Sequence, residues 1–516
     1  MDKIDSMKDK GVEDRKSIHL ALELFLASTI LCIYSYTRLY NIGARYSYDY
    51  DEGVYLQTAK QMLNGYKLYE RIFLSQPPIL IYLVATSMSF LGADLYAGRL
   101  PIALTSILAG VALYLAARRL CNPIAGIVGL AILTVDRVFL RYSRAVEGEV
   151  PCIAFAMLAY LFIVEYIYRD RSIYSFASGL ASSIAILSKF LAAPILPAIL
   201  PVFFTRIGSK SFRSDVGGSR RLKGLVAFII GASIPLAILL QFNPVDLYDQ
   251  LYMYHRSKPL GGTAIDKLIQ LYGFLSEDLA ALILGSIGLI VAFASLNIGC
   301  LPASLNLLIS ISMLVFLPQP LWYHHAAVLS PQLSLLSGLT VGYSAKICMR
   351  MYTRSSKRKS GSRFKAILLV AVMGLSTISI YTVSAALSAP DILGVVFKGG
   401  SEPEYRVAEL IRNLTSPDEW IISDDQAMVF IAGRNVPPEL CDTSFMRISS
   451  GYLGDDEAIY LAEAYRVRVV VFWTGRLVQL KRFLEYVEAN YRLIGVYDSG
   501  RRIYIRRELT PNNRFA

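Results

Sequence analysis

The chain has 516 residues, of which 54% are hydrophobic and only 18% are charged, and its mean hydropathy is positive. A water-soluble protein of this length would carry more charge, and several apolar runs reach the roughly 17–25 residues that cross a bilayer as a helix. These totals exclude an ordinary soluble protein and predict a polytopic α-helical membrane protein. The net charge of +12 would suggest nucleic acid in a soluble protein, but here it fits cytoplasmic loops rich in Lys and Arg, so no nucleic-acid partner is expected.

The chain opens with residues 1–17, which are polar and of mixed charge and are expected to be disordered or to lie at the cytoplasmic surface. Residues 18–40 form the first apolar run, predicted to be an uncleaved membrane anchor. The external segment after it has apolar residues at helical spacing between positions 54 and 69, which favours an amphipathic helix in the membrane interface. The apolar run at 79–91 is short for a span and is predicted to be re-entrant or interfacial.

Ten further apolar segments follow, and together with the first they predict about eleven transmembrane helices. They occupy residues 98–117, 124–135, 150–168, 174–187, 191–204, 224–242, 279–297, 303–317, 326–343 and 366–387. With the amino terminus inside, the connections at 118–119, 169–171, 206–223 and 346–365 are also inside, and all four are basic. This charge distribution satisfies the positive-inside rule and predicts a multi-pass protein of the cell membrane with a cytoplasmic amino terminus.

Residues 388–516 change character, because helical patterns alternate with short buried strands. The transmembrane domain is therefore expected to occupy residues 18–387 and to be followed by an extracytoplasmic α/β domain. Helices are predicted at 402–414, 456–465 and 477–491, strands at 419–423 and 467–473, and a hairpin at 493–506 turning at Ser499-Gly500. The triplet at 413–415 fits the N-glycosylation pattern, which also arises often by chance.

Three carboxylates, those of Asp49, Asp51 and Glu52, lie within four residues just beyond the first apolar run. One interpretation is a helix start, with Asp51 as the N-cap and Glu52 in the first turn. The other is catalytic: one carboxylate abstracts a proton from an acceptor hydroxyl while another orients it or holds a metal. The two interpretations are compatible, because a helix N-terminus also stabilises negative charge.

The second external loop carries three arginines, Arg137, Arg141 and Arg144, which runs against the positive-inside trend. They could lie along one helical face, and a fixed anionic partner is predicted because Arg binds phosphate through paired hydrogen bonds. The alternative is local pairing of Arg144 with Glu147 or Glu149.

Basic residues also stand among aromatic ones in the external loop 243–278, where His255, Arg256 and Lys258 suit a sugar phosphate. An ordinary aromatic belt at the interface explains most of the tyrosines in this loop. Later in the chain, His324 precedes a second histidine. Adjacent histidines point in different directions on a helix, so a metal is not expected there, and a hydrogen bond from His324 to phosphate or sugar is favoured.

Several of these residues resemble a known family. The segment Asp51-Glu52-Gly53-x-Tyr55, the pair Pro77-Pro78 and the pair Arg99-Leu100 are similar to the opening of the C-type membrane glycosyltransferases. The nearest branch is the group of protein O-mannosyltransferases (dolichyl-phosphate-mannose-protein mannosyltransferases) and lipid A aminoarabinose transferases. The segment Arg144-x-x-Glu147-x-x-x-Pro151 resembles the second conserved loop of that family.

The resemblance implies a C-type glycosyltransferase fold and transfer of a sugar, a hexose such as mannose, from a polyprenyl-phosphate or dolichyl-phosphate carrier in the bilayer. The acceptor would be a hydroxyl of a protein, lipid or glycan on the non-cytoplasmic face. Asp51 corresponds to the catalytic base, assisted by Glu52, and Arg144 and Glu147 correspond to the loop-two pair. Gln76 stands where the family often has a basic residue. Lys and Arg can stabilise a leaving phosphate without metal, so no cofactor is expected.

Three other classes of protein remain as alternatives. An oligosaccharyltransferase would use a pyrophosphate-linked glycan and a divalent metal, and would carry a WWDxG-like motif, whereas Trp420 and Trp473 are isolated. A lipid or polysaccharide transporter or flippase would show polar residues inside its spans and broken helices in repeated halves. A membrane-anchored binding protein would leave the acidic first loop without a role.

Overall fold

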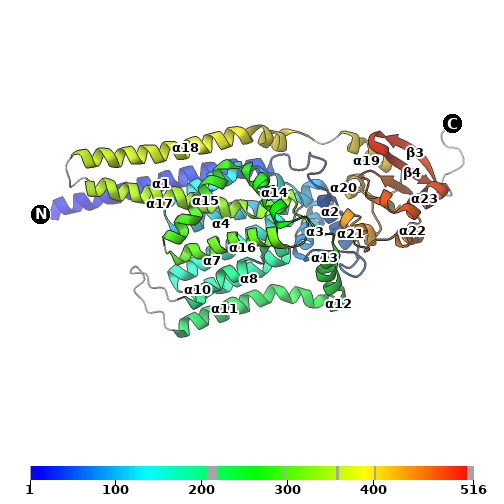
Figure 1. Cartoon of the computed structure of the whole chain (residues 1–516), viewed down its shortest axis with the longest axis horizontal. Helices are drawn as coiled ribbons and strands as arrows, with labels where there is room; N and C mark the ends of the chain where they lie inside the picture. Colours follow the sequence, from blue (N-terminus) through cyan, green and yellow to red (C-terminus); the bar gives the residue numbers. More distant parts are fainter. Residues whose placement is uncertain (1, 206–217, 296, 356–359, 400–401, 508–516) are drawn as a thin grey trace.

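The computed structural model describes residues 2–205, 218–295, 297–355, 360–399 and 402–507. Long helices run side by side in a bundle, and a smaller domain with a β-sheet covers one end of it (Figure 1). The amino terminus lies at the opposite end of the bundle from this domain. The predicted arrangement of a helical membrane domain followed by an α/β domain is therefore confirmed.

Each of the eleven predicted apolar segments coincides with helical structure. The single helices are α1 (Asp2–Leu39), α4 (Leu95–Leu120), α5 (Pro123–Val135), α7 (Glu149–Arg169), α8 (Ser172–Ser188), α11 (Gly218–Leu236), α15 (Leu279–Ala294), α16 (Leu301–Phe316), α17 (Ser330–Ser355) and α18 (Ser360–Phe397). Six helices of the described chain are long and apolar enough to cross a membrane alone. They become seven if α14 (Ala264–Ser276) and α15, between which the chain bends by 114°, form one span.

One predicted span is broken into short pieces. Residues 190–204 form η1 (Phe190–Ala192), α9 (Ile195–Ile199) and α10 (Pro201–Phe204). Pro194, Pro197 and Pro201 remove backbone N–H donors in this stretch, which explains why one continuous helix does not form. At the amino terminus α1 begins at Asp2, so the polar residues before the first apolar run continue the same helix.

The segment after α1 forms α2 (Tyr50–Leu63) and α3 (Ile79–Leu91). The sequence predicted α2 as an amphipathic helix in the membrane interface, but residues 52–59 are all buried. These residues are buried because the carboxyl-terminal domain covers the polar face of α2. Contact is so close that a Cβ atom at Gly53 would lie 2.4 Å from the backbone nitrogen of Ala427 in α20 (Gln426–Ile431).

The carboxyl-terminal domain is built on a four-stranded sheet with the order β1-β2-β4-β3. Its strands are β1 (Ile421–Ser423), β2 (Val469–Phe472), β3 (Tyr491–Tyr497) and β4 (Arg501–Arg506). Strands β1 and β2 are parallel, with Ile422 opposite Val470, and the predicted hairpin pairs β3 with β4. The helices α19 (Glu402–Leu414), α22 (Asp455–Ala464) and α23 (Lys481–Asn490) match the predicted ones, whereas α20 and α21 (Phe445–Ser449) were not predicted.

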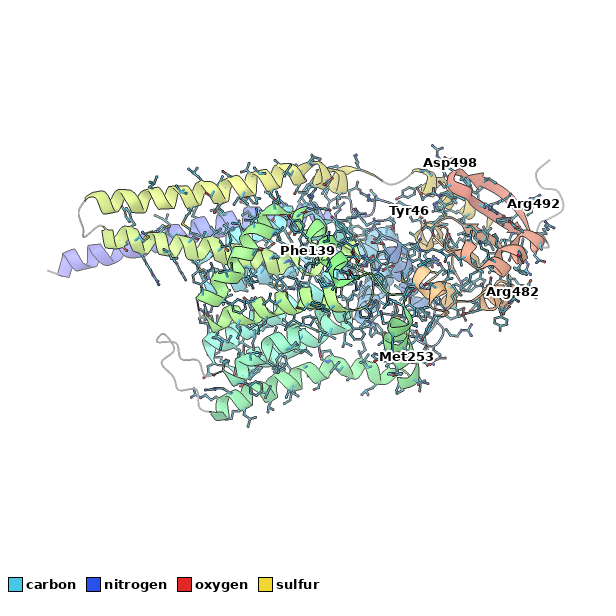
Figure 2. The ribbon with its side chains drawn as sticks, viewed as in Figure 1. Tyr46, Phe139, Met253, Arg482, Arg492 and Asp498 are labelled. Carbon is cyan, nitrogen blue, oxygen red and sulfur yellow. The ribbon has the colours of Figure 1, made fainter. Side chains whose placement is uncertain are left out.

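The hydrophobic core continues from the bundle into this domain. Tyr46 and Phe139 are buried at 7% and 0% exposure, and Figure 2 shows them in the interior, whereas Arg482, Arg492 and Asp498 lie at the surface of the sheet domain. A polar contact also joins the two parts: the Lys60 ammonium donates to the carbonyl of residue 434 at 2.8 Å. The junction is thus packed, and it can hold a site with walls from both domains.

Salt bridges locate the basic connections. Arg118, at the end of α4, pairs with Glu23 of α1, and Arg119 pairs with Glu165 near the end of α7 at 3.2 Å. Helix α4 begins beside α2, which the sheet domain covers, because a Cβ atom at Gly98 would lie 2.4 Å from the Leu56 side chain. The amino terminus of α1 lies at the end of the bundle opposite the sheet domain (Figure 1). The basic loops 118–119 and 169–171 and the sheet domain therefore lie at opposite ends, as the charge pattern predicted.

Candidate active site

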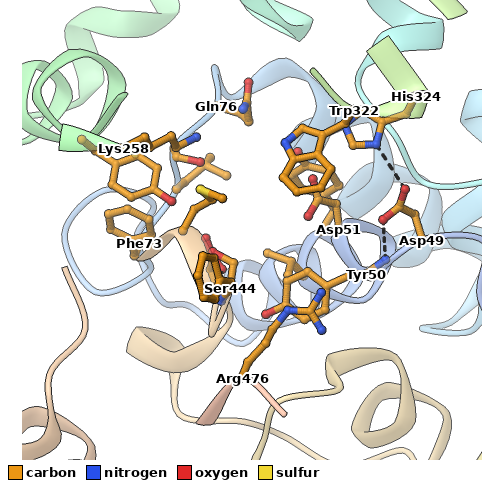
Figure 3. Close-up of a pocket in the computed structure, with 18 of the residues that line it drawn as sticks. Asp49, Tyr50, Asp51, Phe73, Gln76, Lys258, Trp322, His324, Ser444 and Arg476 are labelled. Carbon is orange, nitrogen blue, oxygen red and sulfur yellow. Dashed lines mark hydrogen bonds and ion pairs between the residues drawn. The ribbon is translucent and has the colours of Figure 1, made fainter. Parts of the chain in front are cut away.

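A cavity of about 250 Å³ lies between the bundle and the carboxyl-terminal domain (Figure 3). It takes its walls from the start of α2, the segment 73–76, the end of α13 (Tyr254–Ser257), the helical turn η5 (Tyr323–Val328) and loops of the sheet domain. The lining residues with polar side chains are Asp49, Tyr50, Asp51, Tyr55, Ser75, Gln76, Tyr254, Lys258, Trp322, Tyr323, His324, Asp442, Ser444 and Arg476.

Asp49 occupies the N-cap of α2, a role that the sequence assigned to Asp51. One carboxylate oxygen accepts from the Tyr50 N–H at 2.6 Å, and the other lies 3.1 Å from His324 Nδ1 and 3.4 Å from the Tyr142 hydroxyl. Burial alone would raise the pKa of Asp49, but the hydrogen bond and charge of His324 outweigh it, and the pKa lies below its usual value. Asp49 is therefore a fixed carboxylate that orients its neighbours.

Asp51 lies in the first turn of α2 and faces the cavity. Its carboxylate makes no hydrogen bond to any other described residue, so its oxygens are available to a ligand. Burial raises the pKa of Asp51, and the nearby charge of Asp49 raises it further. A carboxylate of raised pKa is a stronger proton acceptor, which suits the predicted role of base.

Glu52 points the other way and does not line the cavity. It is fully buried and binds Arg99 through two hydrogen bonds of 2.7 and 2.8 Å. It also accepts from the backbone N–H groups of Tyr48 and Val146, each at 3.0 Å. The structure thus places Glu52 as a link between α2, α4 and the loop before α7, out of reach of a bound substrate.

The three arginines of the second external loop do not share one helical face. The helix α6 (Arg137–Tyr142) ends before Arg144, whose guanidinium is buried and donates to the Tyr48 hydroxyl at 3.0 Å and to the Thr37 carbonyl at 2.7 Å. Arg144 therefore does not reach the cavity, nor does it pair with the glutamates after it. Arg137 and Arg141 also lie outside this cavity and line a second one, described below.

Behind Asp49 lies a buried group of ionisable side chains. Glu149 accepts from the Lys189 ammonium at 2.6 Å and lies 3.7 Å from His324, so Lys189 is paired inside the protein. Glu147 is fully buried, and neither of its carboxylate oxygens has a hydrogen-bond partner among the described residues. Burial and the neighbouring charges of Asp51 and Glu149 raise the pKa of Glu147 well above its usual value.

This group has the donor atoms that a divalent cation prefers. Ligand atoms of Asp49, Glu147 and His324 lie within 4.8 Å of one another, and so do those of Glu149, His324 and His325. The two unpartnered oxygens of Glu147 favour the first set, so these residues could hold a cation. The Lys189 ammonium already supplies a positive charge beside Glu149, which is consistent with activity that needs no metal. The expectation of metal-independent activity stays a prediction.

On the facing side of the cavity, Lys258 presents its ammonium (Figure 3). His255 supports it from behind: its Nδ1 lies 3.2 Å from the Lys258 ammonium and its Nε2 2.6 Å from the Ser75 carbonyl. Burial lowers the pKa of His255 to about 4 and that of Lys258 to about 8. His255 is therefore neutral at neutral pH and does not itself line the cavity, while Arg256 is exposed to solvent and lies apart from it.

The carboxyl-terminal domain contributes a second cation, Arg476, whose guanidinium carbon lies 3.7 Å from the centre of the Tyr50 ring. The loop that carries it is held by Asp424. The buried carboxylate of Asp424 accepts four backbone N–H bonds, from residues 473, 474, 476 and 477, at 2.6–3.2 Å. Asp424 directly follows the strand predicted at 419–423, and the sequence offered no signal for Arg476.

The comparison with protein families finds one match. Residues 75–234 match the family described as dolichyl-phosphate-mannose-protein mannosyltransferase. An uncharacterized protein of Aquifex aeolicus (strain VF5) is 28% identical over 171 residues, which are 32% of this chain and 34% of that protein. The match therefore spans about a third of the length of this relative.

Solved structures match almost the whole chain. ArnT from Cupriavidus metallidurans in the apo state has a TM-score of 0.58 at 12% identity, covering 95% of this chain and 98% of that chain. The chain has the C-type membrane glycosyltransferase fold of the protein mannosyltransferase and ArnT group. The archaeal oligosaccharyltransferase AglB from Archaeoglobus fulgidus, in complex with an inhibitory peptide and a dolichol-phosphate, shares this C-type glycosyltransferase fold with a TM-score of 0.53 at 13% identity, covering 95% of this chain and 75% of that chain.

Proposed function

We propose that this C-type glycosyltransferase moves a sugar from a polyprenyl-phosphate carrier to a hydroxyl acceptor on the non-cytoplasmic face of the membrane. The observation that carries the proposal is one cavity with a free carboxylate, Asp51, and a half-buried ammonium, Lys258, on facing sides (Figure 3). A carrier phosphate needs a cation, and an acceptor hydroxyl needs a base. The donor class follows from similar proteins, since ArnT has been seen bound to undecaprenyl phosphate and AglB in complex with a dolichol-phosphate.

In the proposed reaction the acceptor oxygen attacks the anomeric carbon of the sugar while Asp51 takes the hydroxyl proton. The bond between the anomeric carbon and the phosphate oxygen breaks, and the electron pair leaves with the carrier as a polyprenyl phosphate. Lys258 stabilises the charge that develops on this phosphate. Asp49, tied to His324, keeps the start of α2 in place and adds the like charge that makes Asp51 more basic.

The sugar is proposed to be a hexose such as mannose, following the description of the matching family. Tyr254, Trp322 and Phe73 line the same cavity and offer aromatic faces on which a pyranose ring can pack. The acceptor is proposed to enter from the side of Asp442, Ser444 and Arg476, since these residues lie on the carboxyl-terminal domain, opposite the bundle.

The test uses purified protein in detergent with a panel of radiolabelled polyprenyl-phosphate sugars. We expect wild-type protein to release or transfer sugar from one donor. Asp51→Asn should lower the rate by about 10²–10⁴-fold, the usual contribution of a general base, while donor binding is kept. Full activity of Asp51→Asn would refute the base assignment.

A matched control separates loss of the base from loss of the fold. Asp246→Asn also replaces one external carboxylate, but Asp246 does not line this cavity, so its activity should equal that of wild type. If no donor is bound or turned over by the wild-type protein, the transferase proposal fails, and the transporter alternative is the one to pursue.

A further inference from the structure

A second cavity, of about 430 Å³, lies beside α6 and the outer end of α18. It is separate from the cavity that holds Asp51, although Tyr323 lines both. Its lining residues are Arg45, Arg137, Arg141, Glu277, Tyr323, Pro390, Asp391, Gly394, Val395 and Lys398. Four of these carry a positive charge and two carry a negative one.

Both acidic residues of this cavity already have partners. Asp391 accepts from the guanidinium of Arg137 at 2.5 Å, and the carbonyl of Glu277 accepts from the same arginine. The Glu277 carboxylate accepts from the Tyr323 hydroxyl at 2.6 Å. Arg137 is therefore neutralised within the protein and is not free to hold a ligand.

The other three cations have no carboxylate within 4.0 Å in the part of the chain that the structure describes. Arg141 uses one guanidinium nitrogen on the Tyr48 carbonyl at 3.0 Å, and its Nε is buried without a partner. Arg45 lies over the Tyr48 ring at 4.9 Å, and Lys398 follows the end of α18. Burial lowers the pKa of Arg45, and repulsion from Arg141 lowers it further. A lowered pKa is expected where positive charges lie close together with no negative charge among them.

The mouth of the cavity lies next to lipid-facing side chains. On α18, Leu387, Leu393 and Phe397 are 57%, 55% and 51% exposed, and they flank the lining residues at positions 390–395. In Figure 1 the same helix runs along the outside of the bundle. Exposed apolar side chains on a membrane helix contact acyl chains, so a headgroup of such a lipid would stand level with Arg45 and Lys398.

We propose that this cavity binds a phosphate group, presented by the headgroup of an anionic membrane lipid, at a site distinct from the one where Asp51 and Lys258 face each other. Arg45, Arg141 and Lys398 would supply the charge-assisted hydrogen bonds. Arg141 also holds the Tyr48 carbonyl, next to the N-cap of α2, so a bound phosphate would steady the segment that carries Asp49. The binding itself does not depend on the proposed transfer reaction.

The test measures ligand binding by the full chain in detergent, by native mass spectrometry and by thermal stabilisation. The probes are phosphatidic acid, phosphatidylcholine as the zwitterionic control, and inorganic phosphate. We expect phosphatidic acid to bind and stabilise, and its affinity to fall when ionic strength rises from about 0.05 to about 0.5 M. If inorganic phosphate bound and stabilised the protein but phosphatidic acid did not, the cavity would still be an anion site, and its ligand would be free phosphate rather than a lipid headgroup.

Variants assign any binding to this cavity. Arg45→Gln combined with Lys398→Gln should weaken phosphatidic acid at least tenfold, since each charge-assisted hydrogen bond contributes roughly that factor. Lys67→Gln combined with Arg482→Gln removes the same charge from exposed positions elsewhere and should leave affinity unchanged. Lys258→Gln, in the other cavity, should also leave it unchanged. Equal binding by wild type and the Arg45/Lys398 variant would overturn the proposal, as would loss of binding only in Lys258→Gln.

Discussion

The ion pair between Glu52 and Arg99 permits a sharp test, because the sequence suggested catalysis for Glu52 and the structure places it in the core. Both side chains are fully buried, and they are joined by two hydrogen bonds of 2.7 and 2.8 Å. The change Glu52→Gln keeps the size of the side chain and removes its charge. The Arg99 guanidinium then stays buried without its counter-ion.

The expected cost follows from this geometry. Breaking a buried ion pair by removing one partner costs about 3–5 kcal/mol, because the remaining charge is uncompensated. The entropy of unfolding scales with chain length at about 2.1 cal/mol/K per residue, so a chain of this size loses about 1 °C of Tm per kcal/mol. We therefore expect Glu52→Gln to lower the Tm by about 3–5 °C.

Thermal unfolding in detergent measures this shift, and the transfer assay measures activity at a temperature where the variant is still folded. The double variant Glu52→Gln with Arg99→Met removes the orphaned charge and should recover part of the lost Tm. The reasoning would be refuted if Glu52→Gln kept the wild-type Tm and yet lost transfer, because that pattern belongs to a residue that acts on the substrate.

Three further predictions concern the cavity. Because burial lowers the pKa of Lys258 to about 8, the affinity for the donor should be full below that pH and should fall as the pH rises through it. The variant Lys258→Arg stays charged and should keep its donor affinity in titrations at higher pH. If Lys258→Arg showed the same pH dependence as the wild-type protein, Lys258 would not be the cation that binds the donor phosphate. Chelation of metal ions by EDTA should leave sugar transfer intact, since Lys189 supplies the positive charge. If EDTA abolished transfer and Mn²⁺ or Zn²⁺ restored it, a metal would instead be assigned to Asp49, Glu147 and His324. Asp424→Asn removes acceptors from the loop that carries Arg476 and should raise the acceptor KM about tenfold with donor affinity unchanged, whereas an unaltered KM would exclude a positioning role.

The helices of the bundle and the α/β domain were predictable because their signals are local. An apolar run long enough to cross a bilayer predicts a transmembrane helix, and a short β-branched run between turns predicts a strand. The hairpin at Ser499-Gly500 is such a case: Ser499 has a φ of 63° and Gly500 one of 76°, values that a tight turn requires. The broken stretch at 190–204 was also local, since its prolines are visible in the sequence.

Only part of the site could be predicted from the sequence, because the surroundings of each side chain depend on how distant segments pack together. The acidic motif at positions 49–52 was recognised, but its three carboxylates have three different surroundings: Asp49 caps α2, Asp51 faces the cavity, and Glu52 is buried against Arg99. No spacing rule distinguishes them, because each environment is made by residues tens or hundreds of positions away. Arg476 was out of reach for the same reason, since it meets Tyr50 only when the two domains pack together.

The close seat of Gly53 against Ala427 has a consequence for biosynthesis. Translation runs from the amino terminus, so the bundle and the carboxylates of α2 are made before the domain that completes the cavity. Until that domain docks, Asp51 stands in an open groove with no wall opposite the bundle, and the residues around Arg476 do not yet exist. The newly made chain thus gains a closed site only when that domain docks. A single added methyl group at position 53 would obstruct the docking, because it would lie 2.4 Å from the Ala427 nitrogen.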